Sequence, residues 1–372
     1  VVVFRLNWVM DNHQPYTNKP RAIVHLDLDA FFCSVEVLRD PSLAGKPIVV
    51  GGRSENRGVV AAASYPARKY GIHSAMPMIE ASRRCKDLVV ISSQHGMYRM
   101  YSKVIMGILR ATSPIIQQVS IDEAYLDLSD EVNEWIEVTD IARKIQLKIS
   151  RDIGLSASVG VATNKMIAKI ASDFQKPNGL TVVPPGTEID FLGPLPVQKI
   201  PGIGPKANER LAKYGIYTVA DMAVIKEDVL KQRFGKMGEA MSRWSKGIDD
   251  RPVHEDHETK SISTERTFSK NIEDQSELLE VVEKLSFKVG EQLKKKKFMA
   301  ATITIKIRYA DFSTFTRQHT VPEPLDDGLE IFRIARKLLV KNWMPGEPVR
   351  LLGVGGSHFS EPHGQLSLGL DV

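Results

Sequence analysis

The chain has little cysteine and no long apolar run, and both absences narrow what it can be. Its 372 residues include only two cysteines, Cys33 and Cys85, which are too few for a disulfide framework or a zinc site of recognisable spacing. No apolar run approaches the roughly 18 residues that a membrane helix needs. We therefore expect a protein of a reducing cytoplasm that does not span a membrane.

Strong net charge and low-complexity sequence are also missing. The formal charge is +5 and 42% of the residues are hydrophobic, a composition typical of globular rather than disordered chains. Because the positive surplus is mild, an anionic partner such as nucleic acid must be bound by local basic patches. The length predicts about two to three domains, or more if the modules are small.

What the chain does have is a pair of acidic motifs, HLDLDAFF at His25–Phe32 and SIDEAYLDL at Ser120–Leu128. Alternation in the first motif predicts a strand with Asp27 on the face opposite its apolar residues. Asp122 and Glu123 add two neighbouring carboxylates. Such a cluster is costly unless hydrogen bonds, bases or a divalent cation compensate it, and hard oxygen ligands suit Mg²⁺ or Mn²⁺ rather than zinc. For any single aspartate an ordinary surface or buried carboxylate is the commoner outcome.

The order of the predicted elements indicates an α+β multidomain protein. Residues 1–20 are expected to be an N-terminal extension, and a strand at 22–29 opens a layer that runs to residue 184, interrupted by a small module at 30–96. Short helices broken by proline and glycine follow at 185–247. Residues 248–261 are polar, without hydrophobic period, and predict a linker.

The last third of the chain has a βαββαβ pattern between residues 262 and 360. Its strand Thr302–Tyr309 alternates isoleucines with Thr304, Lys306 and Arg308, which predicts one core face and one basic face. A tail at 361–372 completes the chain.

Five motifs carry a resemblance to a known family. They are HLDLDAFF, GVVAAASYPARKYG, SIDEAYLDL, SVGVATNKMIAKIASDFQKPNG and IPGIGPK. In this order they resemble the Y-family translesion DNA polymerases, and in particular their bacterial members, over about residues 21–370. The resemblance implies a right-hand polymerase with these parts: palm 21–29 and 97–184, small fingers 30–96, helix-hairpin-helix thumb 185–247, linker 248–261, βαββαβ little finger 262–360 and clamp-binding tail 361–372.

The resemblance also implies a catalytic site. Asp27 and Asp122 would hold two Mg²⁺ ions, for which Mn²⁺ can substitute, and Glu123 would bind the ion at the primer end. The backbone carbonyl of Leu28 would complete the ligand set. A primer 3′-hydroxyl would then attack the α-phosphate of a deoxynucleoside triphosphate. Two further aspartates of the motifs are expected to have supporting and structural roles, Asp29 and Asp127 respectively.

A nucleotide site is implied by the same resemblance. Phe32 matches the aromatic residue that excludes a 2′-hydroxyl, and Phe31 beside it is expected to lie nearer the core. Tyr65 and Arg68 are three residues apart, which places them on one face of a helix, and match the triphosphate-binding pair. Lys176 of KPNG matches a third cationic contact.

The chain departs from the family pattern near this site. Ala62 and Ser64 stand where relatives often carry threonine or serine and asparagine. The resemblance therefore leaves open whether these two positions contact the triphosphate or the template base.

The contacts to DNA and to a partner protein are predicted from three places. The PGIG turn would let backbone N–H groups approach a phosphate, as in a helix-hairpin-helix. Basic side chains on the C-terminal strands would follow the phosphates. The residues that we expect to bind DNA are Gly202, Gly204, Lys206, Lys306, Arg308 and Arg317. The C-terminal QLSLGL resembles a peptide that docks into the bacterial sliding clamp, through Gln365, Leu366, Leu368 and Leu370.

The implied function is template-directed DNA synthesis of low fidelity past damaged bases, without proofreading, by a cytoplasmic monomer. Its partners would be primer-template DNA, deoxynucleoside triphosphates and the clamp. Two other classes remain open. A nucleotide cyclase could build a similar two-metal site but would not use a PGIG clamp, and a catalytically silent repair scaffold would be free to lose Asp27, Asp122 or Glu123.

Overall fold

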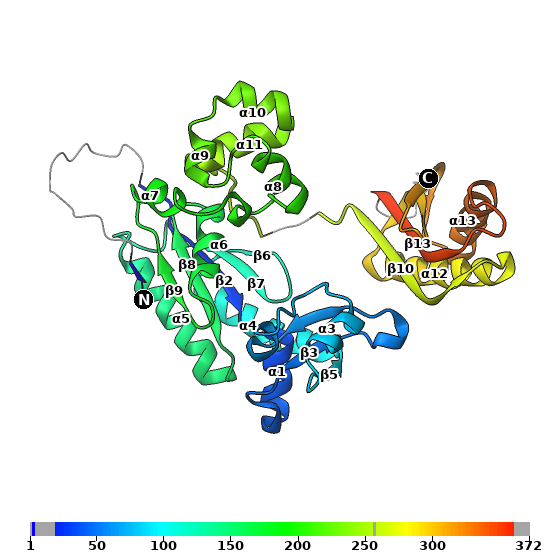
Figure 1. The fold of residues 1–372 in the computed structure, drawn as a ribbon, viewed down its shortest axis with the longest axis horizontal. Helices are drawn as coiled ribbons and strands as arrows, with labels where there is room; N and C mark the ends of the chain where they lie inside the picture. Colours follow the sequence, from blue (N-terminus) through cyan, green and yellow to red (C-terminus); the bar gives the residue numbers. More distant parts are fainter. Residues whose placement is uncertain (1, 4–18, 256–257, 361–372) are drawn as a thin grey trace, which may run out of the picture. The chain divides into compact units, whose positions relative to one another are not determined.

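The computed structural model describes residues 2–3, 19–255 and 258–360 of the chain. Contacts between Cα atoms divide it into two units (Figure 1). The first holds the residues up to 255, apart from the short segments Gly52–Val59 and Met76–Glu80, which are grouped with the C-terminal unit. No helix of the described residues is both long and apolar enough to cross a membrane.

The centre of the first unit is a six-stranded sheet. In spatial order its strands are β1 (Val2–Val3), β9 (Leu180–Val182), β8 (Ala157–Ala162), β2 (Ile23–Leu28), β7 (Glu123–Asp127) and β6 (Ile115–Gln118). The predicted strand at 22–29 is present, and the second acidic motif begins between the paired strands β6 and β7 and continues along β7. Two residues of the predicted N-terminal extension also pair with β9.

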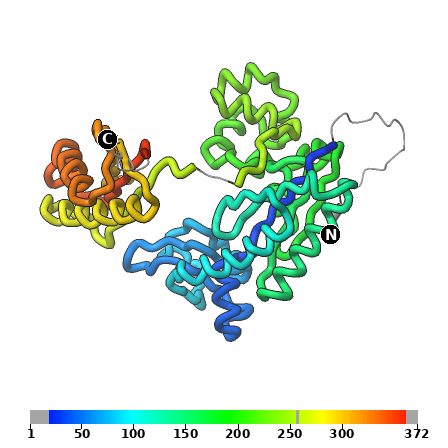
Figure 2. Tube along the Cα trace, turned by 180° about the vertical axis from the view of Figure 1, so that it is seen from behind, coloured from blue at the N-terminus to red at the C-terminus, as the bar shows by residue number. Residues whose placement is uncertain are grey.

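Apolar side chains cover both faces of this sheet. Val24, Leu26 and Leu28 of β2 lie in one cluster with side chains of α4 (His95–Arg110) and α5 (Glu137–Ile153). Ile23 lies in a second cluster with α6 (Lys165–Phe174), on the opposite face. The tube in Figure 2 follows the chain through these layers. Burial on both faces explains why β2 is nearly continuous in apolar residues up to its carboxylate.

A smaller module is inserted between β2 and the β6–β7 hairpin. Its three-stranded sheet has the order β4 (Val60–Ala63), β3 (Ile48–Gly51) and β5 (Val89–Ser92). Its helical segments are α1 (Phe31–Arg39), η1 (Pro41–Leu43), η2 (Ser54–Asn56), α2 (Tyr65–Arg68) and α3 (Met78–Arg84). These elements occupy the stretch predicted as fingers.

Short helices follow β9 along the chain, as the proline and glycine spacing predicts. They are α7 (Glu188–Leu192), η3 (Val197–Lys199), α8 (Pro205–Ala212), α9 (Val219–Ala223), α10 (Glu227–Phe234) and α11 (Lys236–Ser245). A capping box starts α9: the Thr218 hydroxyl accepts a hydrogen bond from the Asp221 amide, and the Asp221 carboxylate accepts one from the Thr218 amide.

The predicted linker at 248–261 is shorter in the structure. The Asp249 carboxylate accepts a hydrogen bond from the Met166 amide at the start of α6 and pairs with Arg251. Val253 is buried in the cluster around α6. The charged composition of this stretch therefore reflects a helix cap and an ion pair between buried Asp249 and exposed Arg251, in addition to a connection.

The C-terminal unit confirms the βαββαβ prediction. Its elements are β10 (Ser261–Ile272), α12 (Gln275–Lys296), β11 (Met299–Tyr309), β12 (Thr314–Leu325), α13 (Gly328–Asn342) and β13 (Val349–Ser360). The strands form an antiparallel sheet of order β10-β13-β11-β12. Apolar residues of α12, α13 and the isoleucines of β11 form the core on one face, which leaves the other face open.

Candidate active site

The register of the six-stranded sheet of the first unit, called the palm sheet from here on, brings the predicted carboxylates together. Asp27 lies directly opposite Glu123 on the neighbouring strand. Asp122 precedes Glu123, and its carbonyl oxygen accepts a hydrogen bond of 3.0 Å from the Leu28 amide. Directly paired residues of antiparallel strands have side chains on the same face. The sheet thus places two carboxylates side by side, with the third next to them in sequence.

The two paired carboxylates each contact a lysine. The Lys176 Nζ lies 2.8 Å from Asp27 Oδ2 and 2.7 Å from Asp173 Oδ1. The Lys169 Nζ lies 2.6 Å from Glu123 Oε1. Burial raises the pKa of Asp27 to about 7 against the lowering effect of Lys176, with Glu123 and Asp173 adding to the rise. The lysines therefore offset a negative charge that the half-buried site tolerates poorly.

The donor set suits divalent cations by its chemistry. Among the residues that the structure describes, no three His, Cys, Asp or Glu side chains are already grouped as metal ligands. The available donors are carboxylate oxygens and a backbone carbonyl, which Mg²⁺ prefers. The ammonium groups of Lys169 and Lys176 contact the same oxygens. The residues present fit Mg²⁺ once these lysines change partners.

Asp29 differs from the other acidic residues of the motifs because it is already satisfied by the protein. It is 2% exposed. Its carboxylate accepts hydrogen bonds from the Tyr65 hydroxyl at 3.1 Å, the Ser158 hydroxyl at 2.8 Å and the Asn178 amide at 2.8 Å. It therefore connects the palm to α2 and to the KPNG segment.

The two adjacent aromatics have separate surroundings. Ala30 has φ 46°, a left-handed conformation that is uncommon for a residue with a side chain, and α1 begins at the next residue. Phe31 is 2% exposed and lies in the core. Phe32 is half-buried and stacks on Tyr98, with ring centres 4.2 Å apart. Tyr98, which the motif analysis missed, supports the face of Phe32.

Tyr65 and Arg68 contact each other on the short helix α2. The Arg68 guanidinium lies 4.6 Å from the centre of the Tyr65 ring. Ser64 precedes the helix, and its hydroxyl accepts hydrogen bonds from the amides of Ala67 and Ile48. The departure from the family pattern at Ser64 therefore has a local role, because this hydroxyl caps the helix that carries Tyr65 and Arg68.

The PGIG turn presents backbone to solvent. Gly202 has φ 100°, a conformation that requires glycine. Gly204 caps α8, and a Cβ atom there would meet nothing within 4 Å. Pro205 occupies the first turn and Lys206 is exposed. This end of α8 is open to an anion, as the sequence predicts.

The three predicted basic contacts on the C-terminal sheet do not share a face. Lys306 and Arg308 alternate with the buried isoleucines of β11, so they lie on the open face. Arg317 pairs with Ile305 and therefore lies on the helix side, where its Nε donates to Asn342 Oδ1 at 3.2 Å. Arg317 therefore lies apart from the other two predicted contacts, because strand pairing decides its face.

Arg350 is a basic residue that the sequence pattern missed. Strict alternation along β13 would place Arg350 on the same face as the buried Leu352. However, Arg308 of β11 pairs with Leu351 and the next residue, Tyr309, pairs with Val349, so Arg350 has no partner in this register and lies in a bulge. Burial lowers the pKa of Arg350, and neighbouring arginines, Arg308 among them, add to the fall. The bulge therefore adds Arg350 to the positive charge near Arg308. The predicted clamp contacts, Gln365, Leu366, Leu368 and Leu370, lie outside the described residues.

Comparisons with known proteins agree with this arrangement. The chain matches the model of the impB/mucB/samB family over residues 26–173, its HHH motif over 185–216 and its C-terminal domain over 259–370. It is 42% identical to DNA polymerase IV of Dehalococcoides mccartyi (strain CBDB1), over 94% of this chain and 90% of the relative. It is 39% identical to DNA polymerase IV of Desulfatibacillum aliphaticivorans, over 91% and 86%.

The chain is also similar to solved structures of DNA polymerases. The Y-family DNA polymerase chimera Dbh-Dpo4(243-245)-Dbh matches with a TM-score of 0.83 and 29% identity, over 92% of this chain and 100% of that one. The insertion ternary complex of Dbh DNA polymerase matches with a TM-score of 0.65 and 29% identity, over 90% and 98%.

Proposed function

The chain belongs to the impB/mucB/samB family of Y-family DNA polymerases and is a DNA-directed DNA polymerase, and we propose that it copies damaged templates by two-metal nucleotidyl transfer. The observation that carries this proposal is the register of Asp27 with Glu123, with Asp122 beside them. Synthesis is expected to be of low fidelity and without proofreading, because no second acidic motif set of the exonuclease kind is evident in the sequence.

The carboxylates would hold two Mg²⁺ ions, or Mn²⁺ in their place. Asp27 and Asp122 would contact both ions, Glu123 the ion at the primer end, and the Leu28 carbonyl would complete the set. Bound ions supply charge neutralisation at the phosphoryl centre and acidify the attacking hydroxyl. The primer 3′-oxygen forms a bond to the α-phosphorus of a deoxynucleoside triphosphate, and the bond to the leaving pyrophosphate breaks.

The side chains around the carboxylates would hold the nucleotide. Arg68 offers a planar fork to triphosphate oxygens and Tyr65 stacks beneath it. Lys176 would exchange Asp27 for the triphosphate, since both are anionic partners within reach of one flexible side chain. Phe32, held flat against Tyr98, would fill the space of a 2′-hydroxyl.

Duplex DNA would be held by its backbone, without base readout. The turn at Gly202 and Gly204 offers amides and Lys206 to one strand, while Lys306 and Arg308 offer cations from the C-terminal sheet. Each such phosphate contact steepens the fall of affinity with salt by about one unit of log–log slope. An affinity for primer-template that does not change with salt would contradict these contacts.

A sliding clamp is the proposed protein partner, bound through the QLSLGL peptide by a monomeric, cytoplasmic enzyme. Support comes from the likeness of Gln365, Leu366, Leu368 and Leu370 to clamp-binding peptides. Deleting residues 365–372 is expected to abolish clamp stimulation and leave basal synthesis unchanged. A truncated chain that the clamp still stimulates would refute the assignment.

Primer extension with Mg²⁺ tests the main proposal. The wild type is expected to add deoxynucleotides to a primer as the template directs, and Asp122→Ala is expected to lower this activity by about 10³-fold or more. A cyclase would consume nucleotide without a primer, and a silent scaffold would bind DNA without extending it. No extension by the wild type would overturn the proposal.

A further inference from the structure

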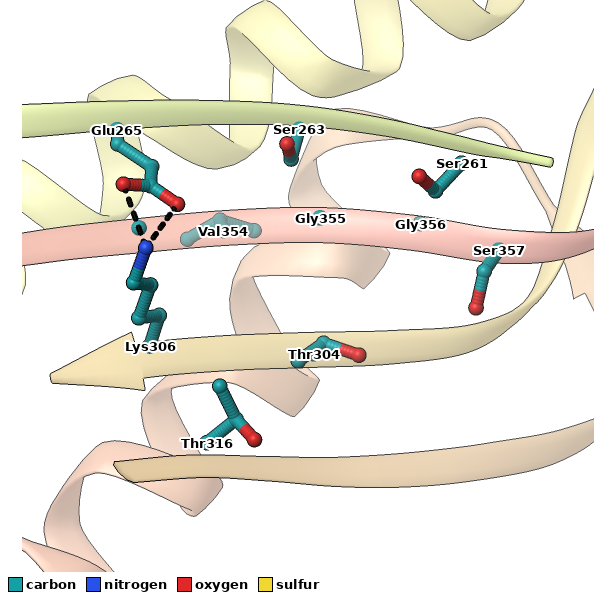
Figure 3. A pocket seen from close by; sticks show the side chains of 11 residues that line it. Ser261, Ser263, Glu265, Thr304, Lys306, Thr316, Val354, Gly355, Gly356 and Ser357 are labelled. Atoms are coloured by element: carbon teal, nitrogen blue, oxygen red, sulfur yellow. Dashed lines mark hydrogen bonds and ion pairs between the residues drawn. The ribbon is translucent and has the colours of Figure 1, made fainter. Parts of the chain in front are cut away.

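The open face of the C-terminal sheet has a hollow of about 210 Å³ lined by small polar residues (Figure 3). Hydroxyl side chains from the strands surround it, and glycines of β13 form its floor. The hydroxyl residues are Ser261, Ser263, Thr304, Thr316 and Ser357. Small side chains let another molecule approach the sheet closely, and hydroxyls can donate to its oxygens.

One end of the hollow carries an ion pair between Glu265 of β10 and Lys306 of β11. Each of the two residues is in register with Gly353 of β13, from opposite sides. Because Gly353 has no side chain, the two reach across it, and Lys306 Nζ lies 2.8 Å and 2.9 Å from the carboxylate oxygens (Figure 3). A Cβ atom at Gly353 would lie 2.8 Å from Glu265 Cγ. The glycine therefore makes this pairing across a strand possible.

The ion pair between Glu265 and Lys306 reduces the positive charge that the open face presents to an anion. Lys306 is one of the two cations of β11 on this face, and the carboxylate engages it with both oxygens. The side chains are 29% and 38% exposed for Lys306 and Glu265. Ion pairs this exposed contribute little to stability, so a phosphate can compete for the lysine. Arg308, by contrast, donates to the neutral Thr314 hydroxyl, so a phosphate can bind it without displacing a carboxylate.

We propose that Glu265 is a built-in competitor for the phosphate that Lys306 binds, and that it limits the affinity of this sheet for duplex DNA. The inference rests on the proposed DNA-binding function. A backbone phosphate over the hollow takes Lys306 from Glu265 and leaves the carboxylate facing the DNA. Each binding event thus exchanges one ion pair for another, so Lys306 contributes little to the free energy of DNA binding. A weaker hold favours release of the template after short synthesis.

Equilibrium binding of the full chain to a primer-template duplex tests this, measured by fluorescence anisotropy across a salt series. Glu265→Gln keeps the shape of the side chain and removes its charge. We expect about two- to fivefold tighter binding and a salt slope steeper by about one. Affinity and slope equal to the wild type, or weaker binding, would overturn the inference.

Two matched variants separate the pair from general repulsion. Glu280→Gln removes a carboxylate that faces Lys284 on α12, on the helix side of the sheet, and is expected to leave binding unchanged. In a Lys306→Gln background the gain from Glu265→Gln is expected to fall by more than half. An equal gain in both backgrounds would show simple repulsion and overturn the proposal. A wild type that binds no primer-template would overturn the proposed function as well, which the Glu265 result alone does not.

Discussion

The two main sheets of this protein carry lysine–carboxylate pairs of the same kind in opposite settings. In the palm sheet, the side chains of Lys176 and Asp27 are 19% and 13% exposed. On the C-terminal sheet, those of Lys306 and Glu265 are 29% and 38% exposed. Burial raises the free energy of an unpaired charge, so Lys176 can leave Asp27 only when another charged group takes its place, while the exposed pair can exchange partners at little cost.

This difference divides the functional residues into two classes. Beside the palm carboxylates, Asp29 is held by three donors, and Lys176 pairs with both Asp27 and Asp173. On the open face of the C-terminal sheet, Lys306 pairs with Glu265 and Arg308 donates to the Thr314 hydroxyl. We expect substitutions in the palm to change chemistry by orders of magnitude, and substitutions on the C-terminal sheet to change affinity by small factors.

After the loss of synthesis in Asp122→Ala, the largest expected effect is on sugar selection by Phe32 of α1. Phe32→Ala removes the ring that stacks on Tyr98, and the preference for deoxyribonucleotides over ribonucleotides is expected to fall by about 10²-fold. The ratio of kcat/KM for the two sugars measures it. Phe31→Leu is the matched control, since Phe31 is in the core; it should cost about 1 kcal/mol of unfolding free energy and leave sugar selection intact. Unchanged discrimination in Phe32→Ala would contradict the assignment.

The second effect tests the ion pair of buried Asp249 with exposed Arg251, which has no part in the chemistry. Asp249→Asn leaves Arg251 without its ionised partner and weakens the cap of α6, which should cost about 2 kcal/mol of unfolding free energy at neutral pH. Burial opposes ionisation of Asp249, but Arg251 and the Met166 amide outweigh it and lower the pKa.

The pH dependence of that effect has a definite sign. A lowered pKa in the folded state gives stability that is present above the unfolded value of about 3.9 and is lost as pH falls through the folded value. Chemical denaturation of Asp249→Asn and of the wild type should therefore converge in acid. If the difference in unfolding free energy between the two proteins stays constant down to the lowest pH at which both fold, the charge of Asp249 does not have the proposed role.

A third, smaller effect concerns the exchange of Lys176 between anions. Lys176→Met is expected to raise the KM for the incoming nucleotide about tenfold, because one triphosphate contact is lost. Lys165→Met is the control on nearby α6, since Lys165 contacts Gln117 instead of a carboxylate of the site. Steady-state kinetics on one primer-template measure both. Equal KM values for the two variants would show that Lys176 acts only on Asp27.

The smallest effect is expected on the C-terminal sheet. Arg308→Gln should weaken DNA binding by about two- to fivefold and reduce the salt slope by about one, equally for all sequences. Arg317→Gln is the matched control, because Arg317 lies on the helix side and bonds Asn342. If Arg317→Gln weakens binding as much as Arg308→Gln, the two faces do not differ as described.

Much of the site was predictable because it depends on local patterns. Alternation in HLDLD placed Asp27 opposite the apolar core face, and the cross-strand register then paired it with Glu123. Ser64 was predictable only as a departure, since its capping role needs the amides of Ile48 and Ala67 to be near. The face of Arg317 was not predictable, because it depends on the register between β12 and β11, which no short window of sequence contains.

By itself the sequence determined the order of the elements, the βαββαβ pattern, the apolar faces of β2 and β11 and the set of acidic residues that could gather. Side-chain period and local propensity encode these, and both act over a few residues. Only the tertiary structure decided which lysine each carboxylate contacts, that residues 249–253 pack on α6, and that Glu265 and Lys306 meet across Gly353. Such contacts join residues far apart in the chain, and strand register and burial fix them together.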